Sequence, residues 1–295
     1  MGPHRPTDEL PQHLEALYRS FPFDRSFDDD PISAVRSLVR DRRTAEVAGV
    51  LASTLAVGNT PSIRRAIGEL ARRLDGDVGR LVDPAWAPER RRRLDGFRHR
   101  WIRGDQIDFL GGRLGAFYAS VPTLEEAFRR GMDDGGFAAG IDRIARVLRG
   151  SDRGRGRPRP PRGYDALFPS PLEGGRSASK RLTLFVRWMV RSRYPDLGLW
   201  TSVPTGELRV PLDQHVHWIA YHLGLTSRRS RSWGTVEEVT EALRRIDPID
   251  PVRYDFVLCH TGISGDCPKE RDLSVCAPCS VRPDCRLWRL PRSAA

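Results

Sequence analysis

KRLTLFVRWMVR, residues 180–191, places four apolar side chains along one face of a helix. These are Leu182, Phe185, Val186 and Met189, and their spacing is typical of a helix that is buried on at least one side. Ser177 or Ser179 is the expected N-cap of this helix. Lys180 then lies in the first turn, where free amide groups and the positive end of the helix dipole disfavour a charged ammonium.

Helical periodicity continues on both sides of this run. Toward the N-terminus, further helices are expected over residues 45–57, 61–74, 109–118, 124–128 and 141–148. Thr44 is the expected N-cap of the first of these, Gly58 ends it, and Pro61 suits the first turn of the next. Toward the C-terminus, a helix is expected over 235–246. Alternating strand patterns are scarce, so the predicted fold class is all-α.

VPLDQHVHWIAYHLG, residues 210–224, predicts another helix. Asp213 is its candidate N-cap and Gly224 ends it. Its apolar face comprises Val216, Ile219, Ala220 and Leu223. The carboxylate of Asp213 is therefore expected at the start of a partly buried helix.

The charge balance favours a polyanionic partner. The 295 residues include 49 basic ones and carry a formal net charge of +11, which is typical of nucleic-acid-binding proteins. Nearly all of the basic residues are arginines, however, and a GC-rich coding sequence produces arginine without selection for binding. Lys180 and Lys269 are the two lysines. Since a desolvated lysine can become a neutral nucleophile and an arginine cannot, Lys180 is a candidate for covalent chemistry.

The chain shows no sign of a membrane segment or an export signal. No run approaches the ~18 apolar residues of a membrane helix. Residues 1–23 lack a basic start followed by an apolar stretch. We therefore expect a cytoplasmic protein without a membrane partner, and we expect it to be a monomer.

Five cysteines lie close to the C-terminus, and four of them have a spacing typical of metal ligands. Cys267, Cys276, Cys279 and Cys285 follow the pattern Cys-x8-Cys-x2-Cys-x5-Cys. Four thiolates suit a [4Fe-4S] cluster or a structural zinc ion, and one close pair with two separate cysteines favours the cluster. Cys259 lacks such spacing and is interpreted as a small core residue.

Residues 151–179 interrupt the helical pattern. Their first part is rich in Arg, Pro and Gly, a composition typical of a solvated connector. The same composition would also suit an arm that follows DNA phosphates and adds salt-dependent affinity.

The order of these motifs resembles the helix-hairpin-helix DNA glycosylases, and endonuclease III in particular. The likeness rests on the lysine helix, the Pro-Leu-Asp-Gln-His motif, a His260-x-Gly262 turn and the terminal cysteine loop. The interval of 33 residues between Lys180 and Asp213 is similar to that of the archaeal 8-oxoguanine glycosylases. The chain departs from the superfamily in LEGGR, residues 172–176, which stands where a Leu-Pro-Gly-x-Gly hairpin is usual.

The resemblance implies a fold of two helical lobes and a catalytic pair. One lobe would comprise residues 36–209, with the basic loop 151–179, and the other residues 1–35 and 210–295, with the cluster loop 267–285. DNA would lie between the lobes, with Lys180 on one and Asp213 on the other. Asp213 would be the catalytic carboxylate, and Lys180 the nucleophile if the enzyme also has AP-lyase activity.

The expected partner is double-stranded DNA that contains a modified base. Candidate DNA contacts are Arg181, Arg187, His215, Arg271, Arg282 and Arg286, and candidate base-pocket residues are Trp188, Tyr194, Trp200 and Trp218. The expected substrate is 8-oxoguanine, for DNA repair, or a hypermodified phage base such as glucosylated hydroxymethylcytosine, for phage defence. The alternatives are a non-catalytic DNA-binding module with a structural Fe-S or zinc site, and an RNA-binding zinc protein.

Overall fold

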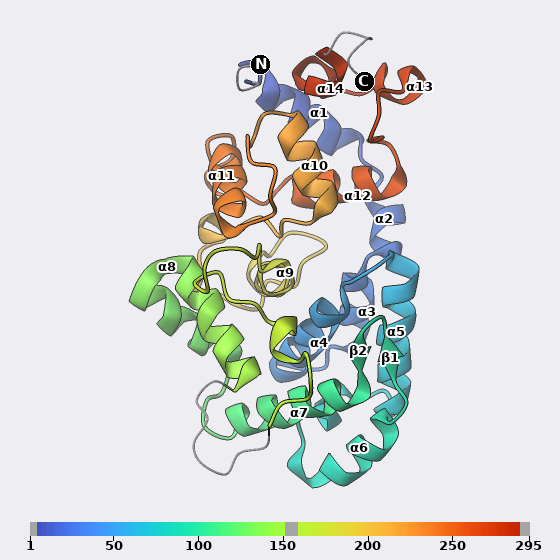
Figure 1. Cartoon of the computed structure of the whole chain (residues 1–295), viewed down its shortest axis with the longest axis vertical. Coiled ribbons are helices and arrows are strands. Elements are labelled where there is room, and N and C mark those ends of the chain that lie inside the picture. The colour runs from blue at the N-terminus through green and yellow to red at the C-terminus, as the bar shows by residue number, and fades with distance from the viewer. Residues whose placement is uncertain (1–4, 151–158, 290–295) are drawn as a thin grey trace. The chain divides into compact units, whose positions relative to one another are not determined.

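The computed structural model describes residues 5–150 and 159–289, and these are mainly helical (Figure 1). In these ranges the α-helices are α1 (Leu10–Ser20), α2 (Phe23–Asp29), α3 (Pro31–Leu38), α4 (Arg42–Leu55), α5 (Thr60–Arg73), α6 (Ala87–Leu94), α7 (Gly104–Tyr118), α8 (Leu124–Arg149), α9 (Lys180–Val190), α10 (Gln214–His222), α11 (Trp233–Arg244), α12 (Asp255–Ser264), α13 (Leu273–Cys276) and α14 (Arg286–Arg289). Short 3-10 turns are η1 (Val78–Leu81), η2 (Pro84–Trp86), η3 (Asp165–Leu167), η4 (Thr205–Glu207) and η5 (Arg282–Asp284). Two short antiparallel strands, β1 (Arg98–His99) and β2 (Ile102–Arg103), form a hairpin. The prediction of an all-α fold is confirmed at this level.

The chain divides into two compact units. Unit 1 takes in the described residues of Met1–Phe23, Gly175–Lys180 and Thr205–Ala295. Unit 2 takes in those of Asp24–Gly174 and Arg181–Pro204. The limits at Asp24 and Thr205 differ from the expected lobe boundaries at residues 36 and 210. Lys180 groups with the C-terminal residues of unit 1 and not with the rest of α9.

A buried carboxylate organises the core of unit 2. Glu46 on α4 is completely buried. Its oxygens accept hydrogen bonds from Tyr118 Oη at 2.9 Å, from the Leu124 amide at 2.8 Å and from Trp200 Nε1 at 2.8 Å. Burial raises the pKa of Glu46, and these hydrogen bonds oppose that effect. One side chain thus joins α4 to α7, α8 and the segment after α9.

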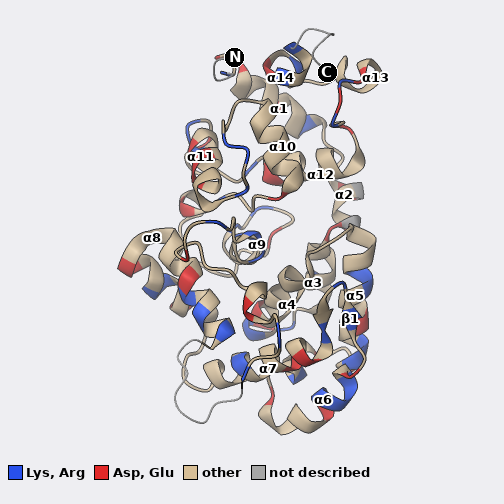
Figure 2. Cartoon of the chain, viewed as in Figure 1, with Lys and Arg blue, Asp and Glu red and all other residues tan. Residues whose placement is uncertain are grey.

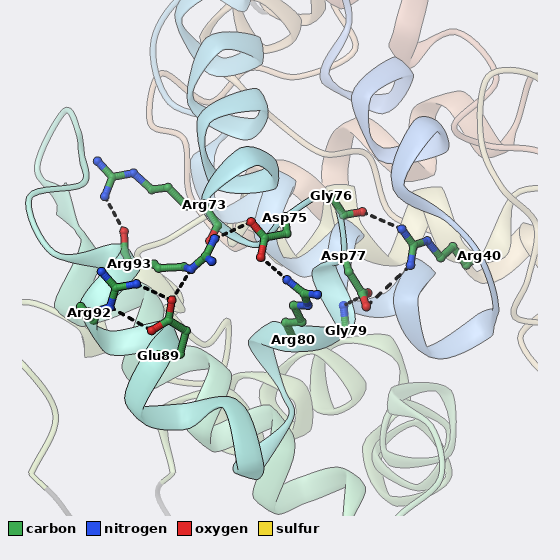
Figure 3. A network of polar contacts seen from close by, with 10 residues as sticks. All are labelled: Arg40, Arg73, Asp75, Gly76, Asp77, Gly79, Arg80, Glu89, Arg92 and Arg93. Atoms are coloured by element: carbon green, nitrogen blue, oxygen red, sulfur yellow. Dashed lines mark hydrogen bonds and ion pairs between the residues drawn. The ribbon is translucent and has the colours of Figure 1, made fainter.

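Basic residues are frequent along α5 and α6 (Figure 2), and several of them form an ion-pair network within unit 2 (Figure 3). Glu89 accepts from Arg92 Nε at 2.9 Å and from Arg93 Nε at 2.5 Å. Asp75 accepts from Arg80 and Arg93. Arg73 donates to the Arg93 and Asp95 carbonyl oxygens. Much of the arginine on these two helices is therefore used inside the fold, so its abundance is weak evidence for DNA binding.

Most of the expected helices form, but several differ at their limits. The largest difference is at α7, which begins at Gly104 and not near residue 109. Thr44 is not the N-cap of α4, because Asp41 takes that place and Thr44 completes a capping box three residues later. The segments 124–128 and 141–148 belong to one long α8, which is kinked at Gly135 and Gly136. The helix expected over 235–246 begins two residues earlier, at Trp233.

The connector predicted over residues 151–179 is only partly described. Its Arg- and Gly-rich first part, 151–158, lies outside the described residues. From 159 onward the chain packs closely, since Tyr164, Leu167 and Phe168 are buried. Tyr164 Oη donates to the Leu148 carbonyl at 2.8 Å. Residues 159–174 are therefore part of unit 2 and are not a solvated connector, whereas residues 175–179 group with unit 1.

Within the described ranges, no helix combines the length and the apolar character that crossing a lipid bilayer requires.

Candidate functional site

Asp213 is the N-cap of α10, as the sequence predicts. Its Oδ1 accepts hydrogen bonds from the His215 amide at 2.8 Å and the Val216 amide at 2.9 Å. These are two of the amide groups that the first turn of a helix leaves without partners. The capping bonds hold Oδ1 against the helix, and Oδ2 is left to face the neighbouring helix α12.

Helix α12 approaches α10 closely at this point because residue 262 is a glycine. A Cβ atom at Gly262 would lie 2.6 Å from His215 Cβ, which is far too close. The glycine therefore allows the two helices to touch beside Asp213, and Cys259 Sγ lies 3.3 Å from Asp213 Oδ2 in hydrogen-bonding geometry. The His-x-Gly motif thus has a packing reason in this structure.

Lys180, Asp213 and Cys259 gather at one place in unit 1. Burial raises the pKa of the Cys259 thiol well above its usual value. The negative charges of Asp213 and Asp255 raise this pKa further, and the positive charge of Lys180 opposes them. Asp213 contacts Cys259 directly, and the charge of Lys180 acts on the same thiol, although these three residues are separated by 33 to 79 positions in the sequence.

The four C-terminal cysteines are neighbours in one loop of short turns. Burial raises the pKa of Cys267 to about 12, and the charges of Cys285, Cys279 and Cys276 contribute to this rise. Their thiols are the soft donor set that iron-sulfur clusters and zinc prefer. In residues 5–150 and 159–289, however, no three His, Cys, Asp or Glu side chains converge closely enough to hold a metal ion. The donor set fits a four-thiolate group, although the thiols do not converge on a single point.

The cysteine loop is fastened to the N-terminal segment within unit 1. Asp284 is completely buried. Its carboxylate accepts hydrogen bonds from the Thr7 amide at 2.7 Å and the Thr7 hydroxyl at 2.6 Å, and it pairs with His13 Nδ1 at 2.6 Å. The N-terminal segment is itself held to the turn before α12, where Arg253 pairs with Glu15 at 2.9 Å. Residues from both ends of the described chain therefore stabilise the loop.

Three of the predicted DNA-contact arginines surround this loop and stack on aromatic rings. The guanidinium of Arg271 lies 4.2 Å from the centre of the Trp288 ring, and that of Arg282 lies 5.1 Å from the same ring. Arg286 stacks on Tyr221 and donates to its hydroxyl at 2.7 Å. All three are half-buried, so the charged face of the loop is partly ordered by these contacts.

The structure removes Arg187 from the set of exposed DNA contacts. Its side chain is buried, and it pairs with the buried Asp196 at 3.1 Å. Arg181 is half-buried and donates to the Leu167 carbonyl at 3.0 Å. His215 is also half-buried, beside Gly262.

Two of the four predicted base-pocket residues belong to the core. Trp188 and Trp200 are each 1% exposed, so neither ring has a free face on which a base could stack. Tyr194 is 46% exposed and lies against Phe27. Trp218 is half-buried, and its ring centre lies 4.1 Å from that of His222. The sequence pattern did not separate the two groups because all four residues lie in or beside apolar helical runs.

The β1–β2 hairpin of unit 2 carries a candidate DNA contact that the sequence analysis missed. Trp101 at its tip is 54% exposed, and Arg98 and Arg100 beside it are also exposed. His99 fixes the hairpin through its Nε2, which lies 3.0 Å from the carbonyl oxygens of Leu55 and Val57. An Arg-His-Arg-Trp run was visible in the sequence, but only the exposure of the tip distinguishes Trp101 from the buried tryptophans.

The comparisons with known proteins identify a family. A family model with the description "Protein of unknown function (DUF2400)" matches residues 30–264, which include Lys180, Asp213 and Cys259 but end before the cysteine loop. No curated protein and no solved structure matches the chain. Because the match covers most of the sequence, the chain belongs to the DUF2400 family.

Proposed function

We propose that this protein is a DNA N-glycosylase that removes a modified base from double-stranded DNA. The observation that carries the proposal is the gathering of Lys180 and Asp213 around Cys259 in unit 1. A carboxylate fixed at a helix N-terminus and a lysine from a distant helix are the two groups that this reaction uses. The resemblance of the surrounding motifs to helix-hairpin-helix glycosylases agrees with this interpretation.

Asp213 would stabilise the transition state. Breaking an N-glycosidic bond builds positive charge on the deoxyribose ring, and a nearby fixed carboxylate lowers the energy of that charge. The capping bonds to Oδ1 keep Asp213 in place before the reaction begins. Its Oδ2 can then orient the nucleophile or accept its proton.

Lys180 would decide between two outcomes. If its neutral amine attacks C1′, the C1′–N bond breaks, and the base leaves with the bonding electrons and is protonated. The attached amine then passes a proton to the ring oxygen O4′ as the C1′–O4′ bond opens, which leaves a Schiff base at C1′. β-Elimination next removes a C2′ proton and expels the 3′-phosphate, which cleaves the strand. If water attacks instead, Asp213 accepts the proton of the water and an abasic site remains. In that case Lys180 binds a phosphate.

We further propose that Cys267, Cys276, Cys279 and Cys285 hold a [4Fe-4S] cluster, with structural zinc as the alternative. Their thiols are neighbours and form a donor set suited to either group. The group would stabilise the loop that presents Arg271, Arg282 and Arg286, and it would take no part in bond cleavage.

The substrate would be 8-oxoguanine or a hypermodified pyrimidine such as glucosylated hydroxymethylcytosine. A glycosylase must turn the base out of the duplex and hold it against side chains. Tyr194 and Trp218 stay candidates for this contact because part of each ring is exposed.

Borohydride trapping on duplexes with single modified bases tests the proposal. We expect the wild-type protein to form a covalent adduct with one of these duplexes, and Lys180→Gln to form none. Abasic sites without an adduct would indicate a monofunctional enzyme. Asp213→Asn should bind the duplex normally and release base at least 100-fold more slowly, since such stabilisation is worth about 10²-fold or more.

The non-catalytic alternative makes the opposite prediction. A DNA-binding module would bind modified duplexes without releasing any base, and Asp213→Asn would retain all of its effects. That result, across the whole panel of duplexes, would overturn the glycosylase proposal.

A further inference from the structure

The thiol of Cys259 is oriented toward the carboxylate that the proposed reaction uses. Cys259 lies on α12, and its Sγ is 3.3 Å from Asp213 Oδ2. The two backbone donors to Asp213 both bind Oδ1. The two oxygens of Asp213 therefore have different donors. The backbone amides of α10 donate to Oδ1, and the thiol contacts Oδ2.

We propose that Cys259 is a positioning residue, whose S–H donates a hydrogen bond to Asp213 Oδ2 and fixes the rotation of the carboxylate group. The catalytic consequence rests on the proposed glycosylase function. The hydrogen bond itself does not, and it can be measured in a protein without any activity.

The direction of the hydrogen bond follows from the surroundings of the thiol. Burial and the neighbouring carboxylates of Asp213 and Asp255 raise the pKa of Cys259, so the sulfur keeps its proton at neutral pH. An ionised carboxylate can only accept, and a thiol can donate. Cys259 is therefore the donor and Asp213 the acceptor.

The bond leaves Asp213 free for chemistry. A carboxylate oxygen has two lone-pair sites, and the thiol occupies one of those on Oδ2. The second site can accept from an amine or a water molecule. The positive charge of Lys180 acts on the same thiol.

The infrared S–H stretching band measures this hydrogen bond directly, because donation lowers its frequency. Subtracting the spectrum of Cys259→Ala from that of the wild type isolates the Cys259 band from the bands of the other cysteines. Asp213→Asn is the matched partner variant. Its side-chain oxygen can still cap α10, but the amide group then faces the thiol and cannot accept its proton.

We expect the Cys259 band at a lowered frequency in the wild type and at the frequency of a free thiol in Asp213→Asn. A band already at the free-thiol frequency, or one that does not move in Asp213→Asn, would overturn the proposal. This outcome does not depend on whether the protein is a glycosylase.

Single-turnover kinetics on a cleaved duplex then test the positioning role. We expect Cys259→Ala to lower the rate of base release roughly 3- to 10-fold, the effect of one ordinary hydrogen bond, with little change in DNA affinity. Cys259→Ser keeps a donor and should recover part of this loss. Because serine also tends to bond to the preceding helical turn, we expect incomplete recovery.

Val257→Ala is the matched control for a purely structural effect. Val257 is a buried neighbour on the same helix, and the change also removes a small amount of side chain. If Cys259 only fills space, both variants will slow the reaction equally, and serine will rescue nothing. If the wild type releases no base at all, the glycosylase proposal fails, and the infrared result alone decides whether the thiol holds Asp213.

Discussion

Gly262 illustrates how one residue fixes the geometry of the candidate site. A methyl group at this position would lie 2.6 Å from His215 Cβ and 2.8 Å from His215 Nδ1. Since His215 follows Asp213 by two residues, any shift of α12 away from α10 would also move Cys259 away from Asp213. The close contact between these helices therefore depends on the absence of a side chain.

We predict that Gly262→Ala destabilises the protein. Alanine favours a helix by up to ~1 kcal/mol over glycine, but forced overpacking costs about 1–3 kcal/mol, so the loss should dominate. Urea unfolding should show the lower stability, and NMR should show shifted signals at His215. Gly68→Ala on α5 is the control, because its nearest atom would be a flexible Arg72 nitrogen at 3.8 Å. Equal effects of the two changes would contradict this explanation.

In the core of unit 2, the single residue Glu46 holds several segments together through its hydrogen bonds. Glu46→Gln replaces one oxygen by an amide group that cannot accept, so at least one N–H donor, from Leu124 or Trp200, loses its acceptor. An orphaned buried donor costs about 1–3 kcal/mol, and we predict a loss of this size in the free energy of unfolding.

Glu126→Gln on α8 provides the comparison for Glu46→Gln. Glu126 forms a surface ion pair with Arg130, and such pairs contribute less than ~1 kcal/mol. Wild-type stability for Glu46→Gln would show that an amide group serves the surrounding donors as well as the carboxyl group does, which would contradict this explanation.

At the scale of elements, local patterns in the sequence predicted where helices begin better than they predicted which residues of different helices touch. Asp213 before one apolar run and Pro61 at the start of another both marked helix starts, and α10 and α5 begin there. Thr44 was the wrong choice for α4, because Asp41 is an equally good cap three residues earlier. A capping box contains two candidate residues, and the sequence alone does not rank them.

The candidate site was predictable only in part. Asp213 and Lys180 were found through their motifs, which are local patterns. Cys259 was interpreted as a small core residue because it lacks the spacing of a metal ligand. Its contact with Asp213, 46 positions away, could not be predicted, since only the packing of α12 on α10 brings the two together. Trp188 and Trp200 were candidates for a base pocket, and only the structure shows that both are buried, since burial depends on neighbours that are distant in the sequence, such as Glu46 for Trp200.

The β1–β2 hairpin gives a prediction for DNA binding. On the proposed function, Trp101 would stack on a base or a base step, a contact worth ~1–3 kcal/mol. Trp101→Ala should therefore weaken duplex binding by about 5- to 150-fold without changing its salt dependence. Arg98→Gln should instead lower the slope of log K against log salt by about 0.9 if Arg98 binds one phosphate.

Arg129→Gln on α8 is the charge-matched control for the hairpin. It also removes one positive charge, but Arg129 is exposed and already pairs with Asp133 at 2.7 Å. Fluorescence anisotropy at several salt concentrations would compare the three variants. If all three behave like the wild type, the hairpin does not contact DNA, and the exposed tryptophan needs another explanation.

At the scale of the whole molecule, the two units are stabilised by different means. Unit 2 contains the hydrogen bonds to the buried Glu46 carboxylate and the arginine network of α5 and α6. Unit 1 ends in a loop of one-turn helices that has few buried apolar residues, and Asp284 ties this loop to Thr7 and His13. A bound metal group would add its binding free energy to the stability of unit 1, since a ligand of the native state stabilises it.

Loss of the proposed metal group should therefore lower the stability of unit 1 and leave that of unit 2 unchanged. On the proposed metal site, we predict that the wild-type protein binds iron or zinc and that Cys276→Ser and Cys279→Ser lose it, as measured by elemental analysis. Hydrogen exchange should rise in the loop 267–289, and also in α1, because Thr7 and His13 lose an ordered partner when the loop opens. Exchange in α4 and α7 of unit 2 should stay as in the wild type.

Cys259→Ser is the control, since it replaces a thiol outside the loop and should keep the metal. A wild-type protein without metal, or exchange that rises equally in both units, would contradict this prediction.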